Sequence, residues 1–429
     1  MKKALIICYD FPPLPSVGSQ RPFSWSKNFY SNNIFPIVIT RKWKDKINNV
    51  ASYFEKDSKG DEIEESSEKL IIKCSYKGNF KSKLFSSNFF INVLRRIITV
   101  FEHLLKWKMS PFDESYFLYE KSRSYLLQNK IDFILVSGQP FTLFKYAYKL
   151  SKEFDVPYVL DYRDGWSTDH AVKSTLLKLI SFQEKKLEEK YLKGASFFTA
   201  ASDNIIKENK KLFPFSKGFL HENGIDLSLL NELKKERRDR NPLFTITFTG
   251  SLYNQHNVRM FIDGVEKFML ENESAIIKVK FVGINLKPSD NTELVNKFQL
   301  KYPNSIEVIE AVSHMDSIRY QLSSSLLLKF DYTGQHQGML GAKLYEYAAT
   351  KKPILTVLSI RNKETTFYPG RNIQYMVTSS DEIVKVVKLL YVKHSQGEII
   401  ESDLSDDEIF SFSREHKIKE LTETIYSNI

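Results

Sequence analysis

The stretch Gly338–Leu355, GMLGAKLYEYAATKKPIL, predicts a helix that begins near Gly341 and leads into a strand. Free backbone N–H groups and the positive end of the helix dipole make a helix start an anion site. Lys343 adds a positive charge beside that start, and Glu346 follows one turn later on the same face. A carboxylate there can accept hydrogen bonds from two ribose hydroxyls. The pattern therefore indicates a nucleotide diphosphate site.

An ordinary amphipathic helix would produce the same pattern. In that interpretation Leu344, Tyr345 and Ala348 form the core face, and the charges of Lys343 and Glu346 are solvated. The rest of the chain has to decide between the two interpretations.

The length of 429 residues suits two domains of about 200 residues each. The two cysteines, Cys8 and Cys74, lie in apolar runs and cannot form a disulfide framework, which indicates reduced core residues of a cytosolic protein. The apolar run near the N-terminus is short and stops at Asp10, so we interpret it as a first strand and not as a signal peptide.

Strands and helices alternate along the chain, which predicts a doubly wound α/β architecture. The first series of strands is predicted at Ala4–Tyr9, Pro36–Thr40, Leu70–Ser75, Phe133–Ser137, Tyr158–Asp161, Phe197–Ala201 and Gly218–His221. The second is predicted at Phe244–Thr249, Ile277–Val282, Ser305–Ile309, Ser325–Lys329 and Ile354–Leu358. The charged stretch within Asn223–Pro242 separates the two series and predicts domains at 1–226 and 227–411. The acidic segment Glu55–Glu68 is expected to be a solvated loop insertion.

Ligands of such folds bind at the carboxyl ends of the strands, where several loops here contain glycine or charged residues. These loops are Asp10–Arg21, Asp161–Trp166, Thr249–Ser251 and Val282–Asn285. A glycine in a tight turn lets the backbone approach a ligand closely, although the turn itself can also require it.

Six motifs in chain order resemble those of GT-B-fold glycosyltransferases, and the chain is similar to family 4, whose members are retaining and depend on a nucleotide sugar. The motifs are DFPPLPSVGSQRP at Asp10–Pro22, LDYRDGWS at Leu160–Ser167, HENGID at His221–Asp226, FTGSLY at Phe248–Tyr253, FVG at Phe281–Gly283 and GAKLYEYAATKKPIL at Gly341–Leu355. The resemblance implies two Rossmann-like domains that face each other across a cleft. It also implies that a last helix, within 412–429, packs back on the first domain.

The resemblance assigns roles to individual residues. It places the diphosphate and ribose at Gly341, Ala342, Lys343 and Glu346, with Gly250 and Ser251 beside the phosphates and Gly338 nearby. It places the base at Gly283, Ile284, Ser313 and His314, and either the transferred sugar or the diphosphate near Gly18 and Ser19. Asp161, Arg163 and Asp164 would face the sugar and the acceptor, with Asp164 orienting or deprotonating the acceptor hydroxyl. Alternatively, Arg163 forms an ion pair with Asp161 or Asp164 that orders the loop.

Two departures from the family pattern concern active-site groups. The family commonly has a glutamate eight residues before the position of Glu346, where this chain has Gly338. It also often has an arginine and a lysine after the glycine that matches Gly250, where this chain has Ser251 and then Asn254–Asn257. These departures leave open a catalytically inactive scaffold that binds a nucleotide or glycan.

Glycosyl transfer needs stabilisation of negative charge on the departing diphosphate. Lys343, the helix start at Gly341 and Arg259 can supply it without a metal, and no Asp-x-Asp motif follows a strand. We therefore expect no metal and no cofactor. Front-face attack with retention is implied by the family alone.

The net charge of +10 is spread among acidic residues without a nucleic-acid-binding motif, so no nucleic-acid partner is expected. Apolar residues of Phe90–Leu105 fall on one helical stripe, with basic residues elsewhere on the helix and Lys81, Lys83, Trp107 and Lys108 flanking it. This segment, within 81–109, either lies on an anionic membrane surface or packs on the sheet of the first domain.

These observations predict a cytoplasmic retaining glycosyltransferase, peripheral on the inner face of the cell membrane. The expected donor is a UDP-sugar, and the expected acceptor is a growing surface glycan or a lipid-linked saccharide. A nucleotide-sugar epimerase of the same fold and the inactive scaffold are the alternatives.

Overall fold

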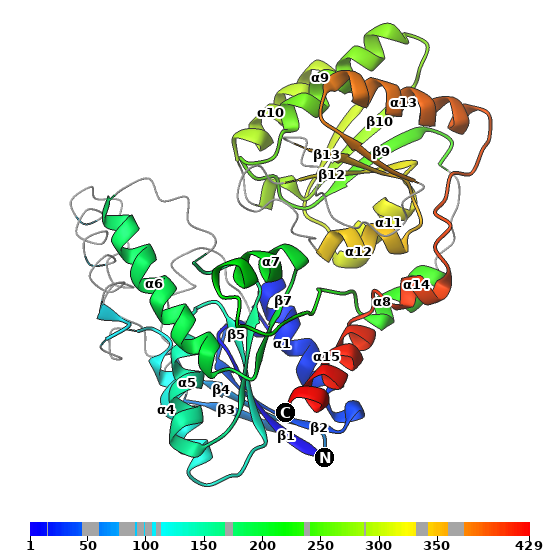
Figure 1. Ribbon diagram of the computed structural model, residues 1–429. Coiled ribbons are helices and arrows are strands. Elements are labelled where there is room, and N and C mark those ends of the chain that lie inside the picture. The colour runs from blue at the N-terminus through cyan, green and yellow to red at the C-terminus, as the bar shows by residue number, and fades with distance from the viewer. Residues whose placement is uncertain are drawn as a thin grey trace. The chain divides into compact units, whose positions relative to one another are not determined.

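The computed structural model divides the chain into two compact units (Figure 1). The described residues are 1–14, 16–44, 60–76, 91, 98, 105–108, 113–167, 175–235, 241–286, 289–331, 342–358 and 373–429. The first unit consists of Met1–Asn223 and Arg414–Ile429, and the second unit consists of Gly224–Ser413.

The first unit contains an eight-stranded sheet with the order β3-β4-β2-β1-β5-β6-β7-β8. Its strands are β1 (Lys2–Cys8), β2 (Ile34–Arg41), β3 (Glu62–Glu65), β4 (Leu70–Cys74), β5 (Phe133–Gly138), β6 (Tyr158–Tyr162), β7 (Phe197–Ala200) and β8 (Gly218–Leu220). The described pairs are parallel except β3 with β4, where Glu62 lies opposite Lys73. From β1 the chain first builds one side of the sheet and then returns to place β5 on the other side, so strand order reverses between β1 and β5.

Side chains of the central strands are buried on both faces of this sheet, because helices cover each face. Helices α4 (Tyr116–Leu126), α5 (Thr142–Phe154), α6 (Thr175–Gly194) and α7 (Asp203–Leu212) contribute to one core, and α1 (Val17–Asn28) and α15 (Arg414–Asn428) contribute to the other. Leu5 and Ile7 of β1 point into the first core, whereas Ala4 and Ile6 point into the second, as the period of two in a strand requires.

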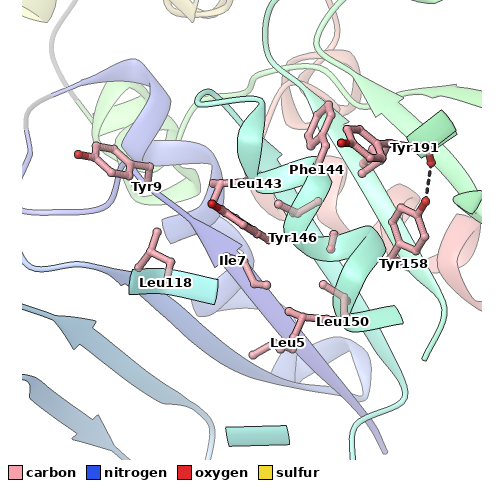
Figure 2. Packing of buried hydrophobic residues seen from close by; sticks show 14 of the residues in the cluster. Leu5, Ile7, Tyr9, Leu118, Leu143, Phe144, Tyr146, Leu150, Tyr158 and Tyr191 are labelled. Atoms are coloured by element: carbon pink, nitrogen blue, oxygen red, sulfur yellow. Dashed lines mark hydrogen bonds between the residues drawn. The ribbon is translucent and has the colours of Figure 1, made fainter. Parts of the chain in front are cut away.

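Figure 2 shows the first of these cores, where aliphatic side chains of β1 and α5 meet a group of tyrosines. Tyr158 on β6 is buried, and its hydroxyl donates to the backbone carbonyl of Tyr191 on α6. This bond satisfies the polar tip of a side chain whose ring lies in the core.

The second unit contains a six-stranded parallel sheet with the order β11-β10-β9-β12-β13-β14. Its strands are β9 (Phe244–Thr249), β10 (Ile277–Val282), β11 (Ile306–Ile309), β12 (Leu326–Phe330), β13 (Ile354–Val357) and β14 (Gln374–Val377). Its helices are α8 (Leu227–Lys235), α9 (Val258–Glu271), α10 (Asp290–Lys301), α11 (His314–Leu322), α12 (Ala342–Ala349), α13 (Ser380–Ser395) and α14 (Asp406–Phe410). Strand order reverses between β9 and β12.

Helices α9, α10 and α13 cover one face of this sheet, and α11 and α12 lie on the other (Figure 1). Helices α8 and α14 pack on α11 and α12 through Leu230, Leu233 and Ile409. Both units are therefore doubly wound α/β layers, as the alternation of strands and helices predicted.

Each predicted strand is present, with ends shifted by up to two residues, but two strands were not predicted. Glu62–Glu65 forms β3 inside the segment expected to be a loop, and Gln374–Val377 forms β14. Trp107, which flanks the predicted amphipathic segment, is buried in the first unit. Its side chain is only 7% exposed, because it stacks on Trp166 with ring centroids 5.1 Å apart.

Candidate functional site

The reversal of strand order in the second unit brings together the carboxyl ends of β9 and β12, the usual ligand position in open α/β sheets. Gly250 follows β9 with a φ of +98°, and Gly283 follows β10 with a φ of +77°. Backbone bonds hold both turns, because the Gly250 N–H donates to Val282 O over 2.7 Å and the Gly283 N–H donates to Ile309 O over 2.9 Å. Both glycines therefore have conformations that other residues rarely adopt.

Lys343 brings its ammonium group to the turn at Gly250. Its Nζ donates to the carbonyl of Thr249 and lies 5.3 Å from the centroid of the Phe248 ring. A Cβ atom on Gly250 would lie only 1.8 Å from this Nζ, so the absent side chain provides the space for the ammonium group. The Lys343 side chain as a whole is exposed, but burial around its end lowers the pKa to about 8.

Glu346 lies one turn after Lys343 on α12 and contacts α11. His314, the first residue of α11, places Nε2 at 2.9 Å from Glu346 Oε1. Ser313 caps α11 by accepting from the Asp316 N–H over 3.1 Å. The structure thus brings together one residue predicted for the ribose and one predicted for the base.

A tyrosine of α12 that the sequence analysis did not single out supports this corner. The Tyr347 hydroxyl of α12 accepts from the Thr249 N–H over 3.2 Å and lies 3.3 Å from the carbonyl of Leu328. It therefore ties α12 to the ends of β9 and β12. No motif signalled this role, because the phenol pairs with backbone groups far away in the chain.

His256 is a second neighbour of Lys343 that the motifs did not single out. Its Nδ1 accepts from the Tyr253 N–H over 3.3 Å, and its ring stacks on Phe330 with centroids 5.7 Å apart. Burial, followed by the charges of Lys343 and Lys329, lowers the pKa of His256 to about 4. The imidazole is therefore neutral near pH 7, and Lys343 supplies the positive charge.

The remaining residues predicted for the donor site differ in burial and in the element that carries them. Ser251 is half-buried, Ile284 is buried in the core, and Ala342 begins α12. Arg259 is on α9, and its side chain is 65% exposed. Its Nη1 lies 4.0 Å from Asp263 Oδ1 on the same helix. Gly338 and Gly341 lie outside the described residues, as does nearly all of the predicted membrane segment 81–109.

In the first unit, the reversal of strand order lies between β1 and β5, and Arg163 connects the loops there. Its Nε donates to Gly138 O over 2.6 Å, and its Nη1 donates to Asp10 Oδ2 over 3.1 Å. The alternative interpretation expected Arg163 to form an ion pair with Asp161 or Asp164. This is wrong, because the carboxylate that Arg163 binds is that of Asp10. A Cβ on Gly18 would lie 1.6 Å from Arg163 Nη1, so this glycine makes room for the guanidinium. Ser19 is buried, and its hydroxyl donates to Leu14 O over 2.7 Å.

Asp161 is fully buried below this loop, and its carboxylate is held by several donors. Arg21 donates through Nη2 over 2.6 Å and through Nε over 2.9 and 3.0 Å. Thr199 and Ser137 donate to the same carboxylate over 2.7 and 3.2 Å. These contacts link α1, β5, β6 and β7 inside the first unit.

Asp164 is half-buried between two anchored neighbours, Arg163 and Trp166. The Trp166 ring lies against Phe141 on one side and Trp107 on the other, with centroids 5.1 Å away in both cases. This loop is therefore held firmly at both ends around the residue predicted to act on the acceptor.

Comparisons with known proteins agree with this architecture. Neither a protein family model nor a curated protein sequence matches the chain. Among solved structures, sucrose-phosphate synthase from Thermosynechococcus elongatus is similar with a TM-score of 0.61 and 11% identity, covering 100% of both chains. Anabaena HepE in complex with UDP is similar with a TM-score of 0.58 and 12% identity, covering 99% of this chain and 100% of its own.

A trehalose-phosphate synthase from Burkholderia vietnamiensis, described as UDP-forming, is similar with a TM-score of 0.60 and 9% identity, covering 99% of both chains. These similar structures are GT-B proteins with two α/β domains, and the likeness extends over nearly the full chain. The fold is GT-B. At such low identities the likeness concerns the GT-B architecture alone.

Two further properties bear on ligands and surroundings. In the part of the chain that the structure describes, no three His, Cys, Asp or Glu side chains are grouped so that they can hold a metal ion. Over the same residues, no helix is both long enough and apolar enough to cross a membrane.

Proposed function

We propose that this GT-B protein is a retaining, metal-independent glycosyltransferase that uses a nucleotide diphosphate sugar, with a UDP-sugar as the first candidate. The observation that carries the proposal is the Lys343 ammonium group held beside Gly250 at the reversal of strand order in the second unit. HepE binds UDP, and trehalose-phosphate synthase forms it, which supports UDP as the first nucleotide to test.

The charge at this corner fits the demand of glycosyl transfer. When the sugar leaves, negative charge grows on the diphosphate, and a fixed cation in a partly desolvated place stabilises that charge. Lys343 would donate to the diphosphate in place of its present bond to Thr249 O. Glu346, held by His314, would accept from the ribose hydroxyls.

The first unit would provide the acceptor side. Asp164 would orient or deprotonate the acceptor hydroxyl, while Arg163 stays bound to Asp10 and to the carbonyl of Gly138. We infer a growing surface glycan or a lipid-linked saccharide as the acceptor, met in the cytoplasm at the inner membrane surface through 81–109. The retaining course of the reaction rests on the resemblance to family 4.

Thermal unfolding with UDP, GDP, TDP and CMP tests the donor site, because a ligand that binds the folded state raises its stability by about 2.7 kcal/mol at 100 times Kd. One nucleotide diphosphate is expected to raise the melting temperature of the wild type, and Lys343→Ala and Glu346→Ala should each reduce that rise. No rise with any nucleotide in a well-folded sample would favour a non-catalytic scaffold.

Gly250 and Gly283 offer a matched pair of variants. Both have positive φ, so alanine strains the backbone at either position, but only a Cβ at Gly250 meets the Lys343 ammonium group; at Gly283 the nearest atom, Gly250 Cα, is 3.9 Å away. Gly250→Ala should therefore weaken nucleotide binding by at least about tenfold, the loss expected for one charge-assisted hydrogen bond, and Gly283→Ala should weaken it much less. Equal losses would argue against a role for the Lys343 position.

Transfer assays then separate the enzymatic alternatives. Incubation of the donor sugar with saccharide acceptors should yield the free nucleotide diphosphate and a longer glycan. Conversion of the donor sugar into its epimer, without transfer, would support the epimerase alternative.

A further inference from the structure

Glu188 on α6 is a fully buried carboxylate that none of the roles above uses. Its Oε2 accepts from the Ser167 N–H over 3.0 Å and also from the Ser167 hydroxyl. Ser167 ends the described part of the loop that follows β6 and carries Arg163 and Asp164. A carboxylate that accepts two hydrogen bonds on one oxygen is a strong anchor for that loop.

The same face of α6 contacts the loop a second time. Tyr191, three residues after Glu188, stacks on Trp166 with centroids 6.3 Å apart and an interplanar angle of 14°. Helix α6 therefore holds two successive loop residues, Trp166 and Ser167. Arg163 fixes the other end of the loop through the carbonyls of Gly138 and Gln139.

Glu188 has a second hydrogen-bonding neighbour, the buried hydroxyl of Tyr162 on β6. Burial, followed by the Glu188 charge and this hydrogen bond, raises the pKa of Tyr162 well above its usual value. The phenol can donate to the charged carboxylate, whereas a protonated carboxyl group would donate to the phenol oxygen, so the direction of this hydrogen bond depends on the charge of Glu188.

We propose that Glu188 is a positioning residue that sets the arrangement of the loop 163–167, and thereby of Asp164, according to whether its buried carboxyl group is charged. This inference rests on the proposed transfer function for its effect on activity, but its effect on the loop is independent of that function. The charged form holds Ser167 more strongly, because a hydrogen bond to a carboxylate is stronger than one to a neutral carboxyl group.

The titration of this group falls near neutral pH. Burial raises the pKa of Glu188 to about 7, against the lowering effect of the hydrogen bonds from Ser167 and Tyr162. The titratable groups that face it are Tyr162 from β6 and Glu184 one turn earlier on α6, and the Glu184 charge adds to the increase. Transfer is therefore expected to rise with pH through about 7 as Glu188 loses its proton.

The test compares Glu188→Gln, Glu188→Ala and the exposed neighbour Glu189→Gln as a control. Glutamine can still accept from Ser167 and can donate to Tyr162, but it does not titrate. Expected results for transfer are a loss of at least tenfold in kcat for Glu188→Ala. Glu188→Gln should keep, at every pH, a kcat near that of the wild type below pH 7, because the side chain is neutral in both cases. The wild type and Glu189→Gln should show a rise with pH near 7 that is absent in Glu188→Gln.

A readout without turnover keeps the test independent of the proposed function. The stacked rings of Trp107 and Trp166 give a near-ultraviolet circular dichroism signal that reports the loop. Its pH titration should show a step near 7 in the wild type, a step at lower pH in Glu184→Gln because the Glu184 charge is removed, and none in Glu188→Gln. A step that persists in Glu188→Gln would overturn the proposal, even if Glu188→Ala does not fold.

UDP binding separates the two proposals. The Glu188 variants should bind UDP as the wild type does, because Glu188 belongs to the first unit and Lys343 to the second. If the wild type binds no nucleotide, the proposed function fails, while the dichroism titration still decides the role of Glu188.

Discussion

The contacts of Asp161 stabilise the first unit, although this residue was predicted to face the sugar and the acceptor. Its carboxylate is fully buried, and Arg21, Thr199 and Ser137 all donate to it. A buried charge that loses its partner costs more than the ion pair contributes, because the remaining charge stays desolvated. The arrangement indicates that Asp161 holds α1 against the sheet.

Asp161→Asn should therefore destabilise the first unit by about 3–5 kcal/mol, since it leaves Arg21 buried without a compensating charge. Urea unfolding followed by tryptophan fluorescence measures this change. The exposed pair of Glu189 and Lys193 provides the control, and Glu189→Gln should leave the midpoint almost unchanged. A variant that keeps its stability and loses turnover would instead give Asp161 a catalytic role.

The titration of Lys343 predicts how nucleotide binding depends on pH, because burial lowers the pKa of this residue to about 8. The charged form binds a diphosphate, so the affinity for UDP should be constant well below pH 8. The affinity should decrease above pH 8, by at most tenfold per pH unit, because a single proton is lost from Lys343. Calorimetric titrations between pH 6.5 and 9.5 measure this dependence.

The exposed Lys297 provides the control for that titration. Lys297→Ala should keep the wild-type dependence on pH, and Lys343→Ala should bind weakly at every pH. An affinity that stays constant up to pH 9.5 in the wild type would contradict a contact between Lys343 and the diphosphate.

The sequence could predict contacts within one helix but not those between distant segments. The spacing of Lys343 and Glu346 predicted a shared helix face, and the structure shows both beside the strand ends. Arg163 binds Asp10, which is 153 residues away in the chain, and Asp161 binds Arg21, which is 140 residues away. No local pattern in the sequence encodes such pairs. The functional roles of the predicted site residues stay predictions.

At the scale of elements, apolar content decided which strands were predictable. The central strands are buried on both faces and appear as continuous apolar runs, which predicted them well. Strand β3, EIEE, is exposed along its whole length and is held at the sheet edge by ion pairs with Lys73. Its composition resembles a solvated loop, so hydrophobic periodicity could not reveal it.

His221 joins two helices of the first unit. Its Nε2 accepts from Trp25 Nε1 of α1 over 3.0 Å, and the ring has a backbone hydrogen bond with Lys417 of α15. Burial, together with the charges of Arg21 and Lys417, lowers the pKa of His221 well below its usual value. The neutral ring therefore holds α15 to α1.

This arrangement predicts how the stability of the first unit depends on pH. Above pH 6.5 the ring is neutral in both the folded and the unfolded chain, so its titration has no effect. As the pH falls below 6.5, only the unfolded chain binds the proton, and the free energy of unfolding decreases by up to about 1.4 kcal/mol per pH unit. Urea unfolding at pH 7.5 and 5.5, followed by tryptophan fluorescence, measures this decrease.

His221→Asn should reduce that dependence on pH, because it removes the titrating group. His416→Gln, at a more exposed position on α15, should keep the wild-type dependence. Equal slopes in all three proteins would show that another group dominates the acid response.

At the scale of the whole molecule, the chain leaves the first unit near Asn223 and returns to it at Arg414. The segment Asn223–Pro242 was predicted as the boundary between the two domains, and its first part forms α8, which packs on α11 and α12 of the second unit. Helix α15 packs on the first unit through Ile418, Leu421 and Ile425. The last helix therefore completes a core whose other members lie hundreds of residues earlier in the chain.

Removal of 414–429 should destabilise only the first unit, because it uncovers the apolar surface beneath α15. The four tryptophans of the chain, Trp25, Trp43, Trp107 and Trp166, all belong to the first unit, so their fluorescence reports its unfolding alone. Far-ultraviolet circular dichroism reports helices of both units. The truncated chain should show a lower fluorescence midpoint, because its first unit is less stable. UDP raises the melting temperature of the part of the dichroism transition that belongs to the second unit, and this part should stay at its wild-type position.

The full chain with Ile418→Ala provides a milder version of this change, since it removes buried side-chain volume and keeps the helix. Its fluorescence midpoint should lie between those of the wild type and the truncated chain, with a loss of about 2–5 kcal/mol for one buried isoleucine. If truncation lowers the fluorescence and dichroism transitions together, and UDP raises both, the two units unfold as one cooperative body. Separate responses would mean that each core is stable by itself, and that the nucleotide stabilises only the unit containing Lys343.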